Sequence, residues 1–131
     1  MKIWIILTCL CTMSYSFFGD QEVVKMEQEH LYKILSFENW QKTQSKETVF
    51  LSPEDDLFIH FSTEDQVEKI VTKYWTGIQQ FVILKIDRSK LEGRLVFETN
   101  AGGATKYFHL YDGFIPVNSI LEAEIVSLSC F

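Results

Sequence analysis

One amphipathic helix, set among short apolar segments, constrains the fold of this chain most strongly. Apolar side chains recur there with the helical period of about 3.6 residues, at positions 67, 70, 71, 74 and 75. Thr63 and Gln66 have the spacing of a capping box, and Gly77 is a residue type that commonly follows a helix. The sequence therefore predicts one main helix between Thr63 and Gly77.

Short apolar or alternating runs on both sides of this helix predict β-strands. We expect strands at residues 30–35, 57–60, 79–87, 94–98, 107–110 and 120–128. Ser36 is a suitable N-cap for a second, shorter helix at residues 37–42. Because strands and helices do not alternate, the pattern favours an α+β fold over a doubly wound parallel sheet. The apolar run Phe81–Ile86 is expected to be a central strand, and Asp112 with Gly113 is expected to form a turn.

The N-terminus has the pattern of an export signal. Lys2 is followed by an apolar stretch at residues 3–13 that is short for a membrane span, and then by small residues at 14 and 16. We expect a signal peptide at residues 1–16, with cleavage after Gly19 or an uncleaved anchor as alternatives. A leader at residues 17–29 and a single domain at residues 30–131 would follow. The protein is then expected to be periplasmic or secreted, with no stable membrane insertion after cleavage.

Charge and cysteine content narrow the classes of partner. The formal net charge is −6, which argues against nucleic acid because phosphate contacts require Lys and Arg. After loss of a signal peptide only Cys130 would remain, so no internal disulfide is expected. Cys130 could still pair between two molecules, and the sequence leaves the oligomeric state open.

Polar residues at the start of the main helix are the first candidates for a site. His60 ends a short apolar strand and is followed by Ser62 and Thr63. In one interpretation the hydroxyls only cap the helix and His60 is a half-buried structural residue. In the other, the helix N-terminus attracts a phosphate or carboxylate and His60 stands beside that anion.

Two further residues extend this candidate site. Glu98 ends an apolar strand, and His109 lies among aromatic residues, where it could form the wall of a pocket or a core position. There is no Cys and His spacing typical of a metal centre, no phosphate-binding glycine loop and no nucleophile elbow. We therefore expect no metal site.

The order of several short motifs resembles a bacterial family known as domain of unknown function 952. The matching segments span most of residues 30–127, and they are Leu31–Ile34 with Trp40 after it, Asp56–Thr63 with Gln66, Phe81–Asp87, Phe97–Glu98, and Phe108–Tyr111. The chain departs from the family pattern at three positions. Leu57 replaces a glycine, Phe108 a proline and Asp112 another glycine.

The resemblance also implies a fold and a ligand. That family is similar in fold to ADP-ribosyltransferases, which have a bent, split, mostly antiparallel β-sheet with one main helix and a cleft that binds NAD. By this analogy Glu98 would be the catalytic acid and His109 would flank the cleft. The residues lining the cleft would be Lys33, His60, Ser62, Thr63 and Tyr74.

Three functions remain open from the sequence. The expected one is a binding module for a nucleotide-like or NAD-like small molecule, without catalysis. The alternatives are an ADP-ribosyltransferase-like enzyme that uses Glu98 and an interaction protein that binds no small ligand. Fold analogy alone does not choose among them.

Overall fold

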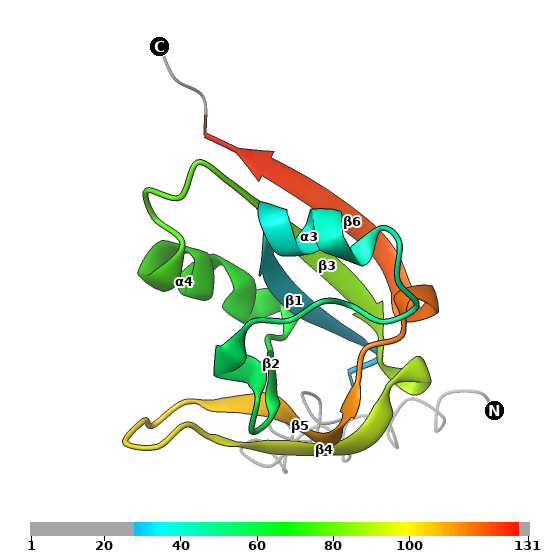
Figure 1. Cartoon of the computed structure of the whole chain (residues 1–131). Helices are drawn as coiled ribbons and strands as arrows, with labels where there is room; N and C mark the ends of the chain where they lie inside the picture. Colours follow the sequence, from blue (N-terminus) through cyan, green and yellow to red (C-terminus); the bar gives the residue numbers. More distant parts are fainter. Residues whose placement is uncertain (1–27, 129–131) are drawn as a thin grey trace, which may run out of the picture.

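Within the part of the chain that the structure describes, two three-stranded antiparallel sheets and two helices form the framework (Figure 1). The computed structural model describes residues 28–128. The strands are β1 (His30–Ser36), β2 (Ile59–Phe61), β3 (Gln80–Asp87), β4 (Glu92–Thr99), β5 (Lys106–Phe114) and β6 (Ile120–Ser127). The helices are α3 (Phe37–Thr43) and α4 (Glu64–Tyr74), and short 3-10 turns are η1 (Pro53–Asp55), η2 (Arg88–Lys90) and η3 (Val117–Ser119). The predicted α+β class is confirmed.

The two sheets meet at one point. The first sheet has the order β1-β3-β6 and the second β2-β5-β4, so the apolar β3 is central, as its sequence predicts. Tyr32 on β1 and Ser62, just after β2, exchange two backbone hydrogen bonds of 2.8 and 2.9 Å. This junction places the end of β2 and the start of α4 beside β1.

The hydrophobic core lies between the sheets. Alternation along each strand sends one set of side chains inward, and a single apolar cluster joins residues of both sheets. Leu31, Val82 and Leu84 come from the first sheet, and Phe61 and Phe108 come from the second; all are at most 2% exposed. The opposite face of the second sheet is therefore left to carry polar side chains.

Helix α3 begins where its capping residue predicts. The hydroxyl oxygen of Ser36 accepts a hydrogen bond of 3.1 Å from the backbone N–H of Asn39. This bond satisfies one of the free N–H groups in the first turn. The helix packs on β1 and β3, which covers part of the first sheet.

Helix α4 follows the predicted stripe but is only partly packed. Gln66 accepts a hydrogen bond of 3.0 Å from the backbone N–H of Thr63, as in a capping box. The helix ends at Tyr74, and Gly77 follows with a φ of 86°. Ile70 is half-buried and Tyr74 is 61% exposed. The apolar side of α4 therefore faces a space that the core does not fill.

The turn predicted at Asp112 and Gly113 is wrong, because β5 continues through both residues to Phe114. The pairing of β4 with β5 shifts register here, and Asp112 has a φ of 53°. A side chain at Gly113 would place its Cβ 1.7 Å from the backbone oxygen of Glu92. These residues thus form a bulge where two strands approach closely, rather than a chain reversal.

Strand β2 is also shorter than predicted. It begins at Ile59, and Leu57 before it is 83% exposed. Phe58 belongs to no strand and is half-buried. The apolar run in the sequence therefore contains two different features. One is the strand that begins at Ile59, and the other is the Phe58 side chain, which stacks on His109 at the outer face of the second sheet.

Some predictions concern residues that the structure does not describe. The signal peptide at residues 1–16, most of the leader at 17–29, and Cys130 lie outside residues 28–128. Within the described part of the chain, no helix has the length and apolar character needed to cross a membrane.

Candidate functional site

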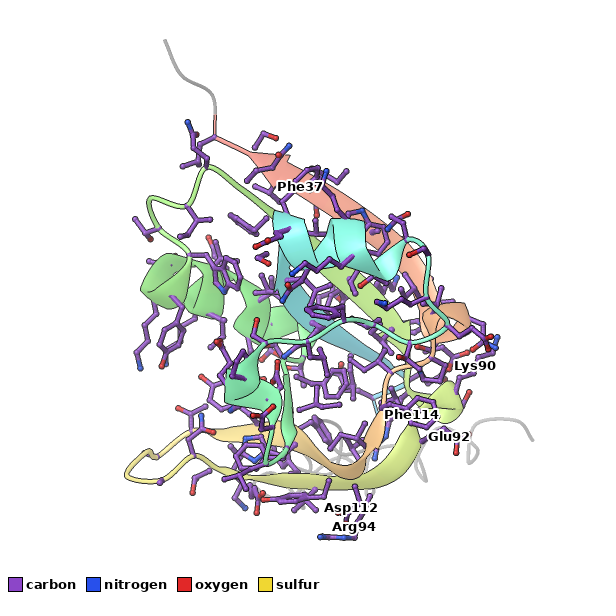
Figure 2. All side chains as sticks on the ribbon, viewed as in Figure 1. Phe37, Lys90, Glu92, Arg94, Asp112 and Phe114 are labelled. Carbon is purple, nitrogen blue, oxygen red and sulfur yellow. The ribbon has the colours of Figure 1, made fainter. Side chains whose placement is uncertain are left out.

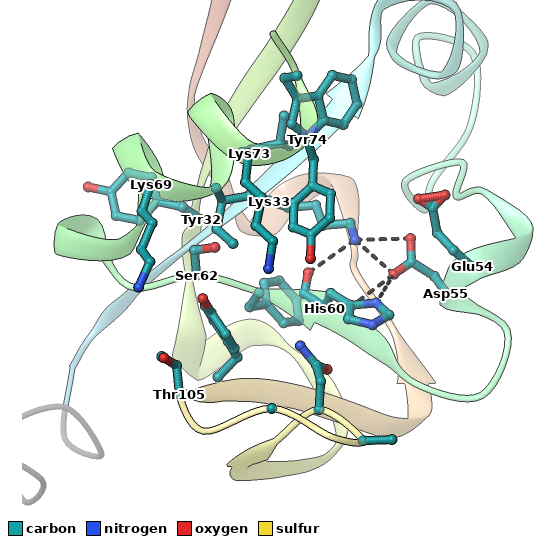
Figure 3. Close-up of a pocket in the computed structure, with 18 of the residues that line it drawn as sticks. Tyr32, Lys33, Glu54, Asp55, His60, Ser62, Lys69, Lys73, Tyr74 and Thr105 are labelled. Carbon is teal, nitrogen blue, oxygen red and sulfur yellow. Dashed lines mark hydrogen bonds and ion pairs between the residues drawn. The ribbon is translucent and has the colours of Figure 1, made fainter.

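A pocket of about 900 Å³ opens between α4 and the loop at residues 100–105 (Figure 3). Its base comes from β1 and the end of β2, where Tyr32, Lys33, His60 and Ser62 line it. The partly packed side of α4 forms one wall and the loop joining β4 to β5 forms another. The junction of the two sheets therefore creates the pocket, and the incomplete burial of α4 leaves it open.

A buried ion pair supports the base of this pocket. Lys33 is 6% exposed, and its Nζ donates hydrogen bonds of 2.8 and 2.9 Å to the two carboxylate oxygens of Asp55. The same Nζ donates a third bond, 3.0 Å long, to the backbone oxygen of His60. All three ammonium hydrogens thus have acceptors. The pair ties β1 to η1 and to β2 (Figure 3).

Asp55 also fixes the His60 ring. Its Oδ1 lies 2.9 Å from His60 Nδ1 and accepts a 3.1 Å bond from the His60 backbone N–H. Burial by itself would raise the pKa of Asp55, but the bonds from His60 and the charge of Lys33 outweigh it and hold the pKa below its usual value. Because an ionised carboxylate only accepts hydrogen bonds, Nδ1 carries the proton. Nε2 is then the nitrogen that remains for a ligand.

A second polar cluster adjoins His60 on the outer face of the second sheet. His60 pairs with His109 across β2 and β5, and the ring centroids are 5.4 Å apart. His109 Nδ1 lies 2.9 Å from Glu98 Oε1, and the Tyr111 hydroxyl donates to the same oxygen. Figure 2 shows Arg94, which pairs with Tyr111, extending from this face away from the first sheet. Two imidazoles, each bonded to a carboxylate, therefore stand side by side.

The environment of His109 favours its neutral form. His109 is 1% exposed. Burial, the largest influence, lowers its pKa below the usual value, and the nearby His60 lowers it further, while the hydrogen bond to Glu98 opposes both. For Glu98, hydrogen bonds from Tyr111 and then from His109 hold the pKa below its usual value. The cluster thus holds a neutral imidazole beside an ionised carboxylate.

The lowered pKa of His109 predicts a pH dependence of stability. Unfolding restores the ordinary histidine pKa of about 6.5, so in mild acid the unfolded chain binds more protons than the folded one. The stabilisation is fully present above that pH and is lost as the pH falls toward the folded value. We expect the free energy of unfolding, measured with urea, to fall as the pH is lowered from about 7.5 to about 5.5, a range that spans the ordinary histidine pKa. His109→Gln should flatten this slope, whereas His30→Gln, on β1 outside the cluster, should retain it. Equal slopes in all three proteins would contradict the assignment.

The structure brings together most of the residues predicted from the sequence. Lys33, His60, Ser62 and Tyr74 line the pocket. Thr63 does not line it: the residue is fully buried, its N–H is bonded to Gln66 and its hydroxyl donates to Asp65.

Glu98 and His109 lie beside the pocket rather than in its lining. The Glu98–His109 bond and the His109–His60 ring contact connect both residues to it. The structure therefore gives one connected group of polar side chains, with Glu98 two strands away from His60.

Several residues of this region were missed by sequence reasoning. Asp55 has no local signal, because its partner Lys33 is 22 positions away. Tyr111 does have a local signal in the sequence. It lies two positions after His109, and alternation places both residues on the same face of the strand. Lys69 and Lys73 lie on α4 outside its apolar stripe, a position typical of solvated charges, and yet both line the pocket.

Comparison with known proteins places this small α+β protein in a family. Residues 34–123 match the family described as protein of unknown function (DUF952), and the chain belongs to that family. The crystal structure of protein CC0527 from Caulobacter crescentus is similar, with a TM-score of 0.65 and 28% identity over 76% of this chain and 88% of that chain. The solution NMR structure of CC0527 gives a TM-score of 0.66 and 27% identity over 78% of this chain and 88% of that chain. No curated protein matches the chain.

Proposed function

We propose that the protein is a binding module for an anionic, nucleotide-like small molecule of the size of ADP-ribose or NAD. The observation that carries this proposal is the composition of the pocket lining. It combines cationic side chains at one wall, aromatic side chains, and an oriented histidine with a hydroxyl at the base. Each of these features suits one part of a nucleotide.

The charges of the pocket favour phosphate groups. Lys69 and Lys73 extend from α4 toward the loop at residues 100–105 (Figure 3). Lys33 is neutralised by Asp55, which leaves these two lysines and Glu54 as the charged groups at the opening. The opening of the pocket therefore has a net positive charge, although the formal net charge of the whole chain is −6. Such a local positive charge attracts anions.

The size and polarity of the pocket favour the remaining parts of such a ligand. Its volume of about 900 Å³ lies within the usual range for small-molecule sites. Tyr32, Tyr74 and Tyr107 offer ring faces on which a base can stack. His60 and Ser62 supply hydrogen-bonding groups that suit the hydroxyls of a ribose.

Two broader proposals accompany this function. The split pair of antiparallel sheets with one main helix supports an ADP-ribosylation-like fold, which the family resemblance first implied. The apolar N-terminal segment at residues 3–13 supports export. N-terminal sequencing of the secreted or periplasmic protein would test export, with Phe17 or Asp20 expected as the first residue.

An ADP-ribosyltransferase-like activity is the second candidate. Its support is the ionised Glu98, which Tyr111 and His109 hold in place. Its weakness is position, because Glu98 is absent from the pocket lining. The binding module predicts that NAD is bound without being consumed, whereas the enzyme predicts NAD consumption that Glu98→Gln abolishes.

A ligand titration tests the binding function. Saturating ADP-ribose is expected to raise the melting temperature by several degrees, because a ligand present at about 100 times its Kd adds about 2.7 kcal/mol of stability. Lys69→Ala/Lys73→Ala should weaken binding by about tenfold or more, since loss of a charge-assisted bond costs about 1.5–3 kcal/mol.

Lys46→Ala/Lys90→Ala is the matched control. It removes the same charge from exposed positions outside the pocket and should bind like the unmodified protein. Equal weakening in both double variants would mean that only net charge matters. If ADP-ribose, NAD and AMP all fail to stabilise the protein at millimolar concentration, any binding is about a thousandfold weaker than ordinary micromolar binding. That result would favour the alternative of an interaction protein that binds no small ligand.

A further inference from the structure

The two sheets leave two strands with a free edge. Within the described residues, β6 borders the first sheet and β4 borders the second, and neither has a strand partner on its outer side (Figure 1). A free edge presents backbone N–H and C=O groups that can pair with another chain, and proteins commonly protect such edges with charged side chains. The charges on β4 and β6 therefore decide which edge can accept a partner.

The strand pairing shows which backbone groups point outward from β4. Successive residues in a strand direct these groups to alternate sides. Ser62 exchanges its two backbone bonds with Tyr32 on β1, so Phe61 directs its groups toward its partner Phe108 on β5. The next residue of β5, His109, then directs its groups toward β4.

Two residues in the middle of β4 thus direct their backbone groups away from the sheet. Val96 pairs with His109, so the N–H and C=O groups of Leu95 and Phe97 point to the free side. The side chains of Leu95 and Phe97 pack against the core and are half-buried. A partner along the regular part of this edge, residues 94–99, would pair with these groups and cover the remaining apolar surface.

A second copy of the same strand fits this edge in one register. In an antiparallel pair of two β4 strands centred on Val96, Leu95 of one copy exchanges backbone bonds with Phe97 of the other. Arg94 then lies directly opposite Glu98, and the two-fold axis repeats this contact. A shift by one residue would exchange the two faces of the strand, and a shift by two would separate the opposite charges.

Both charged side chains are accessible for this contact. Arg94 is exposed, lies 4.7 Å from the centroid of the Tyr111 ring, and extends from β4 as Figure 2 shows. The Glu98 side chain is 36% exposed, and its bonds from His109 and Tyr111 both go to Oε1. Its second oxygen, Oε2, accepts neither of these bonds. Arg–carboxylate contacts are among the stronger charge-assisted hydrogen bonds.

The edge of β6 opposes the same kind of pairing. Glu122 and Glu124 are exposed on one face of this strand, which contains no basic residue. Antiparallel self-pairing centred on Glu122, Ala123 or Glu124 places two of these carboxylates directly opposite each other. Because like charges in that position are destabilising, charge favours β4 over β6 as the edge that accepts a second copy.

We propose that two copies of this protein associate through β4, as an antiparallel pair of edge strands centred on Val96 with reciprocal Arg94–Glu98 contacts. The pair joins the second sheets of the two copies into one continuous sheet. The regular part of the edge is short, so the dimer belongs to the class of small, transient interfaces. Its population then rises with protein concentration.

Sedimentation of the purified protein from about 1 µM to about 1 mM, a range that spans moderate to weak association, measures the dimer. A reducing agent prevents Cys130 from linking two molecules. Val96→Lys places two lysines opposite each other at the two-fold axis and should weaken association at least about fivefold. Ile125→Lys makes a similar change on the exposed face of β6 and should associate like the unmodified protein. Equal association of Val96→Lys and the unmodified protein would overturn the proposal.

Two charge variants test the register. In Arg94→Glu the new glutamate faces Glu98 of the second copy, and in Glu98→Arg the new arginine faces Arg94, so each variant alone should associate at least about fivefold more weakly. An equimolar mixture brings together one copy of each, which restores two complementary contacts and should restore association. Folded variants whose mixture stays monomeric would overturn the register. If circular dichroism shows that Glu98→Arg is unfolded, Arg94→Glu and Val96→Lys still decide.

Hydrogen exchange at the amides of Leu95 and Phe97 identifies what occupies the edge. Protection that rises with protein concentration and is lost in Val96→Lys supports the second copy. A protein that stays monomeric at every concentration, with rapid exchange at both amides, would overturn the proposal. A monomer in which both amides are already protected would overturn it in favour of residues 1–27 of the same chain, which lie outside the described part.

Discussion

Replacing Asp55 with asparagine is expected to lower the free energy of unfolding by about 3–5 kcal/mol, the usual cost of removing one partner of a buried ion pair. Asparagine has nearly the same shape, so no large cavity forms. The Lys33 ammonium, 6% exposed, would be left with an uncharged amide in place of two carboxylate oxygens. Urea denaturation at neutral pH measures the loss.

The control is Glu54→Gln at the neighbouring position. Glu54 is exposed, and exposed charges contribute at most about 1 kcal/mol. The double variant Lys33→Met/Asp55→Leu replaces both partners by apolar groups. Its loss of unfolding free energy should be smaller than the sum of the losses in Lys33→Met and Asp55→Leu, because no charge remains buried. Additive losses, or an Asp55→Asn variant as stable as Glu54→Gln, would show that the pair does not support the base of the pocket.

Substituting alanine for Gly113 is expected to destabilise the protein by about 3 kcal/mol, at the upper end of the usual cost of overpacking. The new Cβ would lie 1.7 Å from the backbone oxygen of Glu92 and 2.7 Å from the Cα of Gly93. Both atoms belong to the backbone of β4, so no side-chain rotation relieves the clash and the strands must separate. Thermal and urea unfolding measure the effect.

Gly103→Ala is the matched control for this change. Gly103 lies in the loop at residues 100–105, where the atom nearest to the added methyl group would be the Asn100 backbone oxygen at 3.3 Å. We expect a cost of less than about 1 kcal/mol there, in line with surface substitutions. Equal losses at both glycines would refute the account of the bulge between β4 and β5.

Local patterns in the sequence predicted the elements that depend on local interactions. Helix α3 begins after Ser36 because a side-chain oxygen three residues away accepts a free N–H, and this spacing is visible in the sequence. The position of β3 could also be predicted, because a strand that is covered on both faces has a continuous apolar run in the sequence. The bulge at Gly113 was missed because Asp-Gly also favours turns. Only the close approach of Gly93, 20 positions earlier by its number, distinguishes the two cases.

The candidate site could be predicted in part. His60, Ser62 and Lys33 line one pocket, and His109 with Glu98 adjoins it. The contribution of Asp55 depends on a contact with β1 that no sequence spacing encodes. The position of Phe58 depends on the packing of a loop on the second sheet. Helix periodicity correctly identified the apolar stripe of α4, but it could not show that part of this stripe borders a pocket rather than the core.

We propose the pocket over His60 as the binding site for an anionic nucleotide-like molecule. A titration of the ¹⁵N-labelled protein with ADP-ribose, followed by ¹H–¹⁵N chemical shifts, tests it residue by residue. We predict saturable shifts at the amides of Tyr32, Ser62 and Tyr74 and in the loop at residues 100–105, with little change along β6, which lies outside the pocket. The absence of saturable shifts, or the largest shifts on β6, would contradict the account.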